Sequence, residues 1–117
     1  MSEQLKNRTK KFALEVIKLV EQLSKGRTTD IIGKQLIRSG TSVGANYRAA
    51  SRAKSPADFI SKMGIVEEEA DEAIYWMELL VESGSLKSDQ VEPLIKEANE
   101  LLAITVSSIK TARSNKK

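Results

Sequence analysis

Apolar residues recur at every third or fourth position along almost the whole of this chain, and no segment shows the alternation of apolar and polar residues that is typical of a β-strand. The repeat falls into four stretches. The first two cover about residues 4–25 and 29–53, the third runs from Ser55 to Gly84, and the fourth begins with Ser88 as its cap. Short connections between such helices force neighbours to run in opposite directions. The sequence therefore predicts an all-α protein, an antiparallel up-down-up-down four-helix bundle.

One side of each predicted helix carries the apolar residues that would form the core of the bundle. These residues are Leu5, Phe12, Val16, Leu19, Val20, Leu23, Ile32, Leu36, Val43, Tyr47, Ala50, Phe59, Met63, Val66, Ala70, Ala73, Ile74, Met77, Leu80, Val81, Val91, Leu94, Ile95, Ala98, Leu101, Leu102, Thr105, Val106 and Ile109.

Residues with known capping preferences mark the ends of the helices. Gly26 stands where a left-handed C-terminal cap would end the first helix, and residues 28–30 (Thr-Thr-Asp) offer N-caps for the second. Ser55 precedes Pro56 at the first position of the third helix, and Asp58 places a carboxylate at the third position.

Three glycines, Gly33, Gly40 and Gly44, interrupt the second predicted helix, although each costs about 1 kcal/mol of helix stability relative to alanine. They follow no strand and lack the spacing of a phosphate-binding loop. We interpret them as positions where another helix packs closely; the alternative is a hinge or a ligand groove.

The residue types that are missing exclude several classes of chemistry. The chain of 117 residues is expected to be one domain over residues 1–113, followed by a basic tail over 114–117. It has no cysteine and no histidine, which excludes thiolate and imidazole metal sites and the Ser-His and Cys-His pairs of nucleophilic enzymes. No apolar run approaches the about 18 residues of a membrane span, and the N-terminus lacks a signal-peptide pattern. We therefore expect a soluble, cytoplasmic protein.

Carboxylates gather in the third predicted helix: Glu67, Glu68, Glu69, Asp71 and Glu72. All fall outside its apolar stripe, so we expect them to point to solvent or to a neighbouring subunit. Metal sites made of oxygen ligands usually draw those ligands from several elements, and a catalytic carboxylate pair needs a cleft. We expect no metal, no cofactor and no enzymatic activity.

The net charge of +3 hides an uneven distribution. Residues 1–62 hold 13 Lys and Arg against 5 Asp and Glu, whereas residues 63–117 hold 6 against 11. One face of the second predicted helix, opposite its apolar stripe, carries a row of basic residues that continues past the helix end: Lys34, Arg38, Arg48, Arg52 and Lys54. A second basic cluster lies near the N-terminus: Lys6, Arg8, Lys10 and Lys11.

Two interpretations of the basic face remain open. It can contact nucleic-acid phosphates through counterion release, without reading bases, and the arginine fork can hold two phosphate oxygens at once. Alternatively, it is an ordinary solvated surface that the acidic third helix neutralises within or between subunits. Stacking of single-stranded bases is not supported, because Tyr47 falls on the core side of its helix.

The third predicted helix also has apolar residues that its core stripe does not explain. Ile65, Trp76 and Leu79 lie about 100–160° from that stripe, and Tyr75 lies close to Leu79. Such a cluster often marks a contact between proteins; the alternative is that another helix or a loop covers it. We predict an oligomer interface formed by Ile65, Tyr75, Trp76 and Leu79.

A series of motifs in the second and third predicted helices resembles the signature of a known family. The motifs are Gln35-Leu36-x-Arg38-Ser39, Ser42-Val43, Asn46-Tyr47, Ser55-x-x-Asp58-Phe59 and Glu67 to Glu69. They are similar to those of four-helix-bundle proteins encoded in intervening sequences of bacterial 23S ribosomal RNA genes. Residues 48–51 (Arg-Ala-Ala-Ser) depart from the family, many of whose members have an acidic residue and a glycine there.

The resemblance implies a four-helix bundle that assembles into rings of five subunits, and it implies no established reaction. Genes of the family lie within ribosomal RNA operons, and relatives act beside reverse transcriptases. Together with the basic face, the resemblance leads us to expect a non-enzymatic homopentamer that binds structured RNA or a ribonucleoprotein partner. The alternative is a structural adaptor that binds another protein and makes no contact with nucleic acid.

Overall fold

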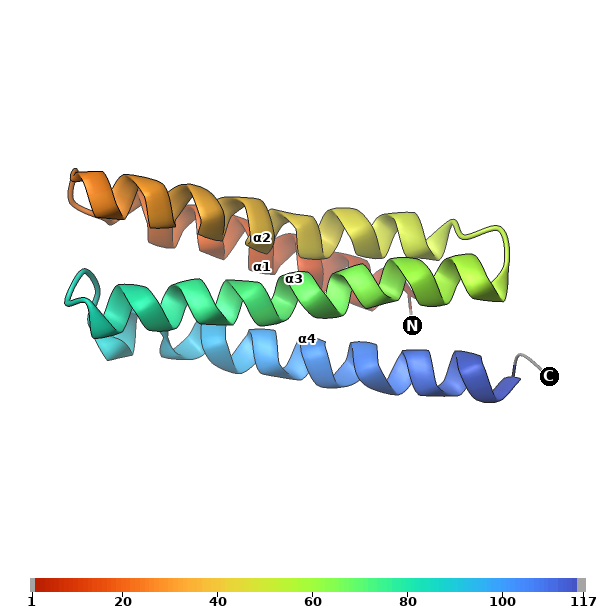
Figure 1. Ribbon diagram of the computed structural model, residues 1–117. Coiled ribbons are helices and arrows are strands. Elements are labelled where there is room, and N and C mark those ends of the chain that lie inside the picture. Colours follow the sequence, from red (N-terminus) through yellow and green to blue (C-terminus); the bar gives the residue numbers. More distant parts are fainter. Residues whose placement is uncertain (1, 116–117) are drawn as a thin grey trace.

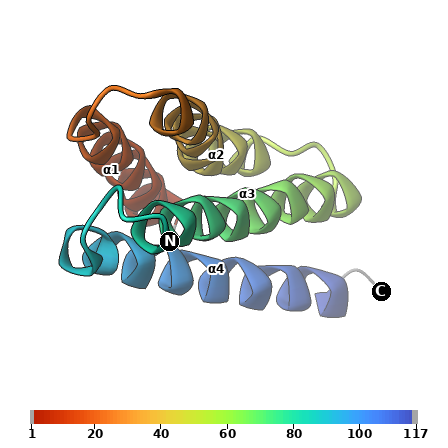
Figure 2. The same ribbon diagram turned by 60° about the vertical axis from the view of Figure 1, so that its left-hand side comes forward.

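The computed structural model describes residues 2–115, which form four long helices and no strand. The helices are α1 (Ser2–Glu21), α2 (Arg27–Ser51), α3 (Pro56–Glu82) and α4 (Ser88–Asn115). Successive helices run in opposite directions, side by side, in a rod of 50 × 20 × 20 Å (Figure 1). The α1–α2 and α3–α4 connections lie at one end of the rod and the α2–α3 connection at the other, as a second view also shows (Figure 2). The predicted antiparallel four-helix bundle is confirmed.

The core is formed by the apolar sides of all four helices. Every residue predicted to line it is buried or half-buried, and Phe12, Leu36, Met63 and Met77 are among the largest side chains with almost no exposed surface. Thr105 is polar and buried, and its hydroxyl donates a hydrogen bond to the Leu101 carbonyl at 2.7 Å. The burial of apolar surface along these stripes is the main contribution to the stability of such a fold.

The connection between α1 and α2 differs from the prediction, because both helix ends lie earlier in the chain than expected. Gly26 is not a left-handed cap of α1; it has φ 171° and ψ 158°, an extended conformation, and is the N-cap residue of α2. The first helical hydrogen bond of α2 runs from the Asp30 amide to the Gly26 carbonyl at 2.9 Å. Thr29 uses its hydroxyl to donate to the carbonyl of Ser24 at 2.7 Å, so it holds the preceding loop. The predicted N-caps at residues 28–30 are therefore wrong.

The start of α3 is as predicted. Ser55 is the N-cap residue, its hydroxyl accepts a hydrogen bond from the Asp58 amide at 3.0 Å, and Pro56 occupies the first position of the helix. The missing N–H of proline costs little at this position, since the first amides of a helix have no partner within the helix.

Gly84 ends α3 as predicted. Its φ of +82° is the one φ in the left-handed region that the described part of the chain contains. The Gly84 amide donates to the Val81 carbonyl at 3.0 Å and the Ser85 amide to the Leu80 carbonyl at 2.9 Å. These two bonds form a Schellman motif, which needs the left-handed conformation that glycine adopts without steric cost.

The start of α4 differs by one residue from the prediction. Ser88 is the first helical residue, and Lys87 precedes it in the capping position. The Gln90 side chain accepts a hydrogen bond from the Lys87 amide at 2.8 Å, and the Gln90 amide donates to the Lys87 carbonyl at 3.0 Å. Gln90 is the third helical residue. In a capping box, the side chain at this position accepts a hydrogen bond from the amide of the capping residue, as Gln90 does from Lys87.

The glycines of α2 lie at its contact with α1, as predicted. A Cβ atom added at Gly40 would lie 2.9 Å from two methyl carbons of Val16, and one at Gly44 would lie 3.3 Å from the carbonyl oxygen of Thr9. A Cβ atom at Gly33 would also be in tight contact with α1. The glycines therefore allow the two helices to approach closely.

The C-terminal end of α4 extends into the predicted tail. The helix continues through Asn115, so residues 114 and 115 are helical, whereas Lys116 and Lys117 lie outside the described residues. No helix that the structure describes is long and apolar enough to cross a membrane.

Candidate nucleic-acid interface

A groove with a volume of about 460 Å³ follows the contact between α1 and α2. Three basic side chains line it: Lys6 and Lys10 from α1, and Arg48 from α2. Glu3 is the one acidic residue in the lining. The rest of the lining is small or polar and consists of Asn7, Thr9, Ala13, Thr41, Gly44 and Ala45. The groove therefore combines a net positive charge with several groups that can donate hydrogen bonds.

The sequence brings these basic side chains together through helix geometry and close packing. Lys6 and Lys10 are four residues apart, so they lie on the same side of α1. Arg48 lies one turn after Gly44, where α2 approaches the backbone of Thr9. Because Gly44 has no side chain, α1 comes close enough for basic residues of both helices to line one groove.

The basic groups of the groove are available to an external anion. Lys10 and Arg48 are exposed and Lys6 is half-buried. Within residues 2–115, none of the three forms an ion pair. Their positive charges are therefore not neutralised by a described carboxylate.

Three further residues of the predicted basic face lie on the exposed surface of α2 or just beyond it. Lys34, Arg52 and Lys54 are exposed, and no described carboxylate forms an ion pair with them. Lys34 and Arg52 are five helical turns apart, so they lie on one line along α2, about 27 Å from each other. Arg48 lies one turn before Arg52 and about 21 Å from Lys34, so the basic surface extends from the groove to the C-terminal end of α2, and Lys34 lies apart from it.

Arg38 belongs to the same predicted face, but it contacts α3. Its guanidinium forms an ion pair with Glu69 at 3.4 Å and another with Glu72. Glu72 also accepts a hydrogen bond from the indole nitrogen of Trp76 at 3.3 Å. At this residue the acidic third helix neutralises the basic second helix, as the alternative interpretation of the basic face anticipated.

The acidic residues of α3 do not all point away from the molecule. The Glu69 side chain is only 17% exposed, and its Oε1 atom is buried without a hydrogen-bond partner in the described part of the chain. The expectation that all of these carboxylates face solvent or a neighbouring subunit is wrong for Glu69, because Arg38 of α2 reaches across to it. The described residues contain no group of three or more acidic side chains that could hold a metal ion.

The residues predicted to form an oligomer interface lie on and beside one stripe of α3. Ile65 is 38% exposed and Tyr75 is 52% exposed, whereas Trp76 and Leu79 are half-buried. Trp76 packs against the core, and its ring meets that of Tyr75 edge to face with centroids 5.2 Å apart. Glu69 and Glu72, the carboxylates that Arg38 contacts, occupy the middle of the same stripe. Arg38 therefore lies beside the predicted interface.

Three other apolar side chains are exposed and did not form part of the prediction. Ile31 is 59% exposed and lies about two turns before Arg38 on the same side of α2. Leu14 and Ile17 of α1 are 52% and 38% exposed. All three fall outside the core stripes of their helices, which is the same signal that identified Ile65 on α3.

Arg8, from the N-terminal basic cluster, joins α1 to α4. Its guanidinium makes two hydrogen bonds to Glu97, at 3.0 and 2.6 Å, and one to Glu100 at 3.0 Å. Hydrogen bonding to Glu97 raises the pKa of Arg8 above its ordinary value, because the pair stabilises the charged guanidinium. Arg8 therefore contributes to the fold instead of lining the groove with Lys6 and Lys10.

Comparisons with known proteins agree with this architecture. A family model described as 23S rRNA-intervening sequence protein matches residues 3–107. The chain is also similar to a crystal structure of a protein with unknown function from the S23 ribosomal protein family of Bacteroides thetaiotaomicron. The two are 37% identical with a TM-score of 0.85, over 91% of this chain and 98% of the other. No curated protein matches the sequence.

Proposed function

This chain belongs to the 23S rRNA-intervening sequence protein family, and we propose that it is a non-enzymatic helical bundle that binds the phosphate backbone of structured RNA. The proposal rests above all on one observation, the gathering of Lys6, Lys10 and Arg48 in the groove between α1 and α2. Lysine and arginine that neutralise phosphates release counterions from the nucleic acid, and this release supplies affinity without sequence recognition. A cytoplasmic location, where ribosomal RNA is found, belongs to the same proposal.

The shape of the basic surface supports binding to double-stranded regions. Lys34 and Arg52 are about 27 Å apart on one side of the α2 region, with Arg48 one turn before Arg52. A double helix presents closely spaced phosphates along its axis, which these residues can contact from one side.

The positions of the aromatic residues argue against single-stranded RNA as the preferred ligand. Binding of single strands depends on bases that stack on exposed aromatic rings. Phe12 and Tyr47 are buried, Trp76 is half-buried and bonded to a glutamate, and the exposed Tyr75 lies on the acidic α3. No aromatic ring lines the basic groove.

The test is a binding titration with a labelled RNA hairpin and a single-stranded RNA of equal length, followed by fluorescence anisotropy at several salt concentrations. The variant K10Q/R48Q is expected to bind the hairpin at least about tenfold more weakly at low salt, and to reduce the slope of log K against log salt by about two. The control K87Q/K96Q removes the same charge from exposed positions outside the groove and is expected to bind like the unmodified protein.

Two results would overturn the proposal. One is the absence of RNA binding at low salt. The other is an equal loss of affinity in the groove variant and in its control, which would show that only total charge matters. The first result would favour the alternative, a protein adaptor whose contacts tolerate salt. The second would show that RNA binding does not depend on the groove.

We also propose that the protein acts as a homo-oligomer, which the family resemblance suggests is a ring of five. The exposed Ile65 and Tyr75 on α3 support an interface there, because clustered exposed apolar side chains often mark protein contacts. In a ring, the basic groove would be repeated in each subunit, and weak phosphate contacts would then add up.

A further inference from the structure

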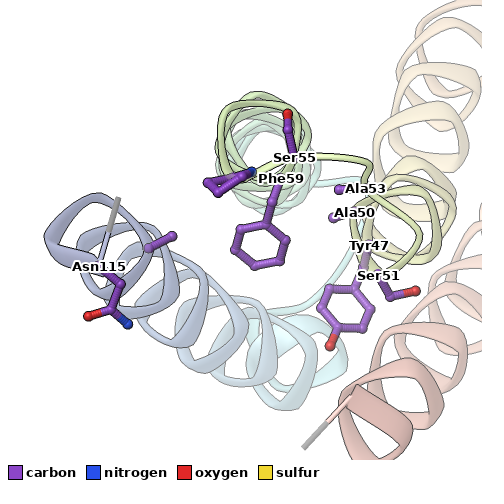
Figure 3. A pocket seen from close by; sticks show the side chains of 9 residues that line it. Tyr47, Ala50, Ser51, Ala53, Ser55, Phe59 and Asn115 are labelled. Carbon is purple, nitrogen blue, oxygen red and sulfur yellow. The ribbon is translucent and has the colours of Figure 1, made fainter. Parts of the chain in front are cut away.

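A cavity of about 460 Å³ lies where α2 ends, α3 begins and α4 ends. Its walls are mostly small and apolar, with Ala50, Ala53 and Ala112 among the lining residues. Figure 3 shows the rings of Tyr47 and Phe59 extending from α2 and α3 into the space between the helices. The volume is within the range of pockets that bind small molecules, about 300–1,000 Å³.

Tyr47 is the unusual group in this cavity. Its side chain is only 3% exposed, its hydroxyl is directed away from its own helix (Figure 3), and it forms no hydrogen bond with the described residues. Buried tyrosine hydroxyls normally have a partner. In the described part of the chain, the one fully buried side-chain atom without a partner belongs to Glu69. The Tyr47 oxygen is therefore still accessible, and the cavity that it lines is where a partner would sit.

The hydroxyl of Tyr47 would act as a hydrogen-bond donor. Burial raises the pKa of Tyr47 above its ordinary value, so the phenol keeps its proton at neutral pH. The serines of the lining are exposed: Ser51 donates to the Arg48 carbonyl at 2.8 Å, and Ser55 accepts from the Asp58 amide. Tyr47 is thus the buried donor that remains for a ligand.

The charge around the cavity favours an anionic acceptor. No acidic residue lines it. Arg52 and Lys54 are exposed and flank Ala53, a lining residue, in the sequence; Asp58, which precedes Phe59, is paired with Lys62 at 2.5 Å. A ligand that fits these features has an apolar body and one negatively charged acceptor group.

We propose that this cavity binds a small aromatic carboxylate, whose ring packs against Phe59 and the alanines and whose carboxylate accepts the hydrogen bond of Tyr47. This site goes beyond RNA binding and does not depend on it, since the cavity and the basic groove share no lining residue.

Benzoate is the probe for the first test, in a titration of the ¹⁵N-labelled full-length protein followed by NMR. Saturable shifts of the Ala50, Ala53 and Ala112 amide signals are expected. Loss of a hydrogen bond to a charged group predicts that Y47F weakens benzoate binding by about tenfold or more. The matched control Y75F removes an exposed hydroxyl outside the cavity and is expected to leave the affinity unchanged.

A second variant keeps the proposal testable if Y47F does not fold. A53L leaves Tyr47 in place but adds side-chain volume to the cavity wall, so it is expected to abolish the shifts. Three results would overturn the proposal: no saturable shifts, unchanged affinity in folded Y47F, or equal binding of toluene, which lacks the carboxylate. Unchanged binding of benzoate to A53L would show that benzoate binds outside this cavity.

Discussion

At the scale of single residues, Gly40 is the glycine where an added Cβ atom would have the least room, because it faces Val16. Val16 is fully buried, and its branched side chain has little rotational freedom, so it cannot move away from an added methyl group. We expect Gly40→Ala to lower the free energy of unfolding by about 1–2 kcal/mol, despite the better helix propensity of alanine. Gly64→Ala is the matched control, because a Cβ atom there meets nothing within 4 Å.

The control is expected to raise the free energy of unfolding by up to about 1 kcal/mol, since Gly64 lies inside α3 and alanine favours the helix. Urea denaturation followed by circular dichroism measures both variants. Equal stabilisation by the two substitutions would contradict close packing at Gly40.

Asp58 makes the start of α3 sensitive to acid. Its carboxylate accepts hydrogen bonds from the Lys62 ammonium at 2.5 Å and from the Lys54 amide at 3.1 Å, and these lower the pKa of Asp58 below its ordinary value of 3.8. Because the pKa is lower in the folded state, the stabilisation is complete above the ordinary value and is lost as the pH falls through the folded-state value.

We therefore expect Asp58→Asn to lower the melting temperature at pH 7, and the difference from the unmodified protein to shrink below about pH 4. Thermal melts between pH 7 and pH 2 measure this. Asp71→Asn is the control, because Asp71 is exposed and forms no ion pair within residues 2–115. A constant difference across this pH range would show that Asp58 acts through another property.

At the scale of helices, α1 and α4 make the smallest contact among the four neighbouring pairs, and polar side chains connect them. The Arg8 guanidinium binds Glu97 through two parallel hydrogen bonds, and Gln90 donates to Gln22 at 3.0 Å. The seam between the two helices is also hollowed beside Phe12. This side of the bundle therefore depends on ionic contacts more than the others do.

The ionic contact predicts a salt-dependent contribution to stability. We expect Arg8→Gln to lower the free energy of unfolding by about 1 kcal/mol at low salt, and by less in 1 M NaCl, because salt screens partly exposed pairs. Urea denaturation at both salt concentrations measures the effect. Lys18→Gln is the control, since the Lys18 side chain is 73% exposed and its pair with Glu15 should contribute almost nothing. If Arg8→Gln lowers the free energy of unfolding equally at both salt concentrations, Arg8 acts through the packing of its side chain and not through its charge.

At the scale of the whole molecule, the uneven charge along the sequence places basic and acidic residues on different helices. The basic half of the sequence contains α1 and α2, which lie together (Figure 1), and most of the acidic residues of the other half lie in α3. A rod with one basic side and one acidic side, with apolar side chains exposed on both, favours contacts between unlike faces of neighbouring copies. Such contacts generate closed rings when the rotation between copies closes.

This arrangement predicts how assembly responds to mutation. We expect Ile65→Ser/Tyr75→Ser to convert the proposed oligomer into a monomer, because both side chains are exposed on α3. Size exclusion with light scattering measures the mass. Leu14→Ser replaces a single side chain of similar exposure on α1 and shows whether that face also takes part. If the unmodified protein is itself a monomer, the proposed interface on α3 is wrong.

The sequence by itself determined the four helices, their antiparallel order and the residues of the core, because the apolar period within one helix decides which side of that helix is buried. It also determined the basic face of α2 for the same reason. Helix ends were predicted well where the signal was local, as at Ser55 and Gly84, and poorly at Gly26, where Thr29 bonds to the preceding loop.

Only the tertiary structure decided which basic residues lie together. Arg38 and Arg48 lie at opposite edges of the basic arc of α2, about 80° apart around the helix. Arg38 contacts the carboxylates of α3, while Arg48 lines a groove with Lys6 and Lys10 of α1. These partners depend on how α2 is rotated against its two neighbours and on the close approach at Gly44. Such relations between helices arise from packing of the whole bundle and leave no periodic signal in any one segment.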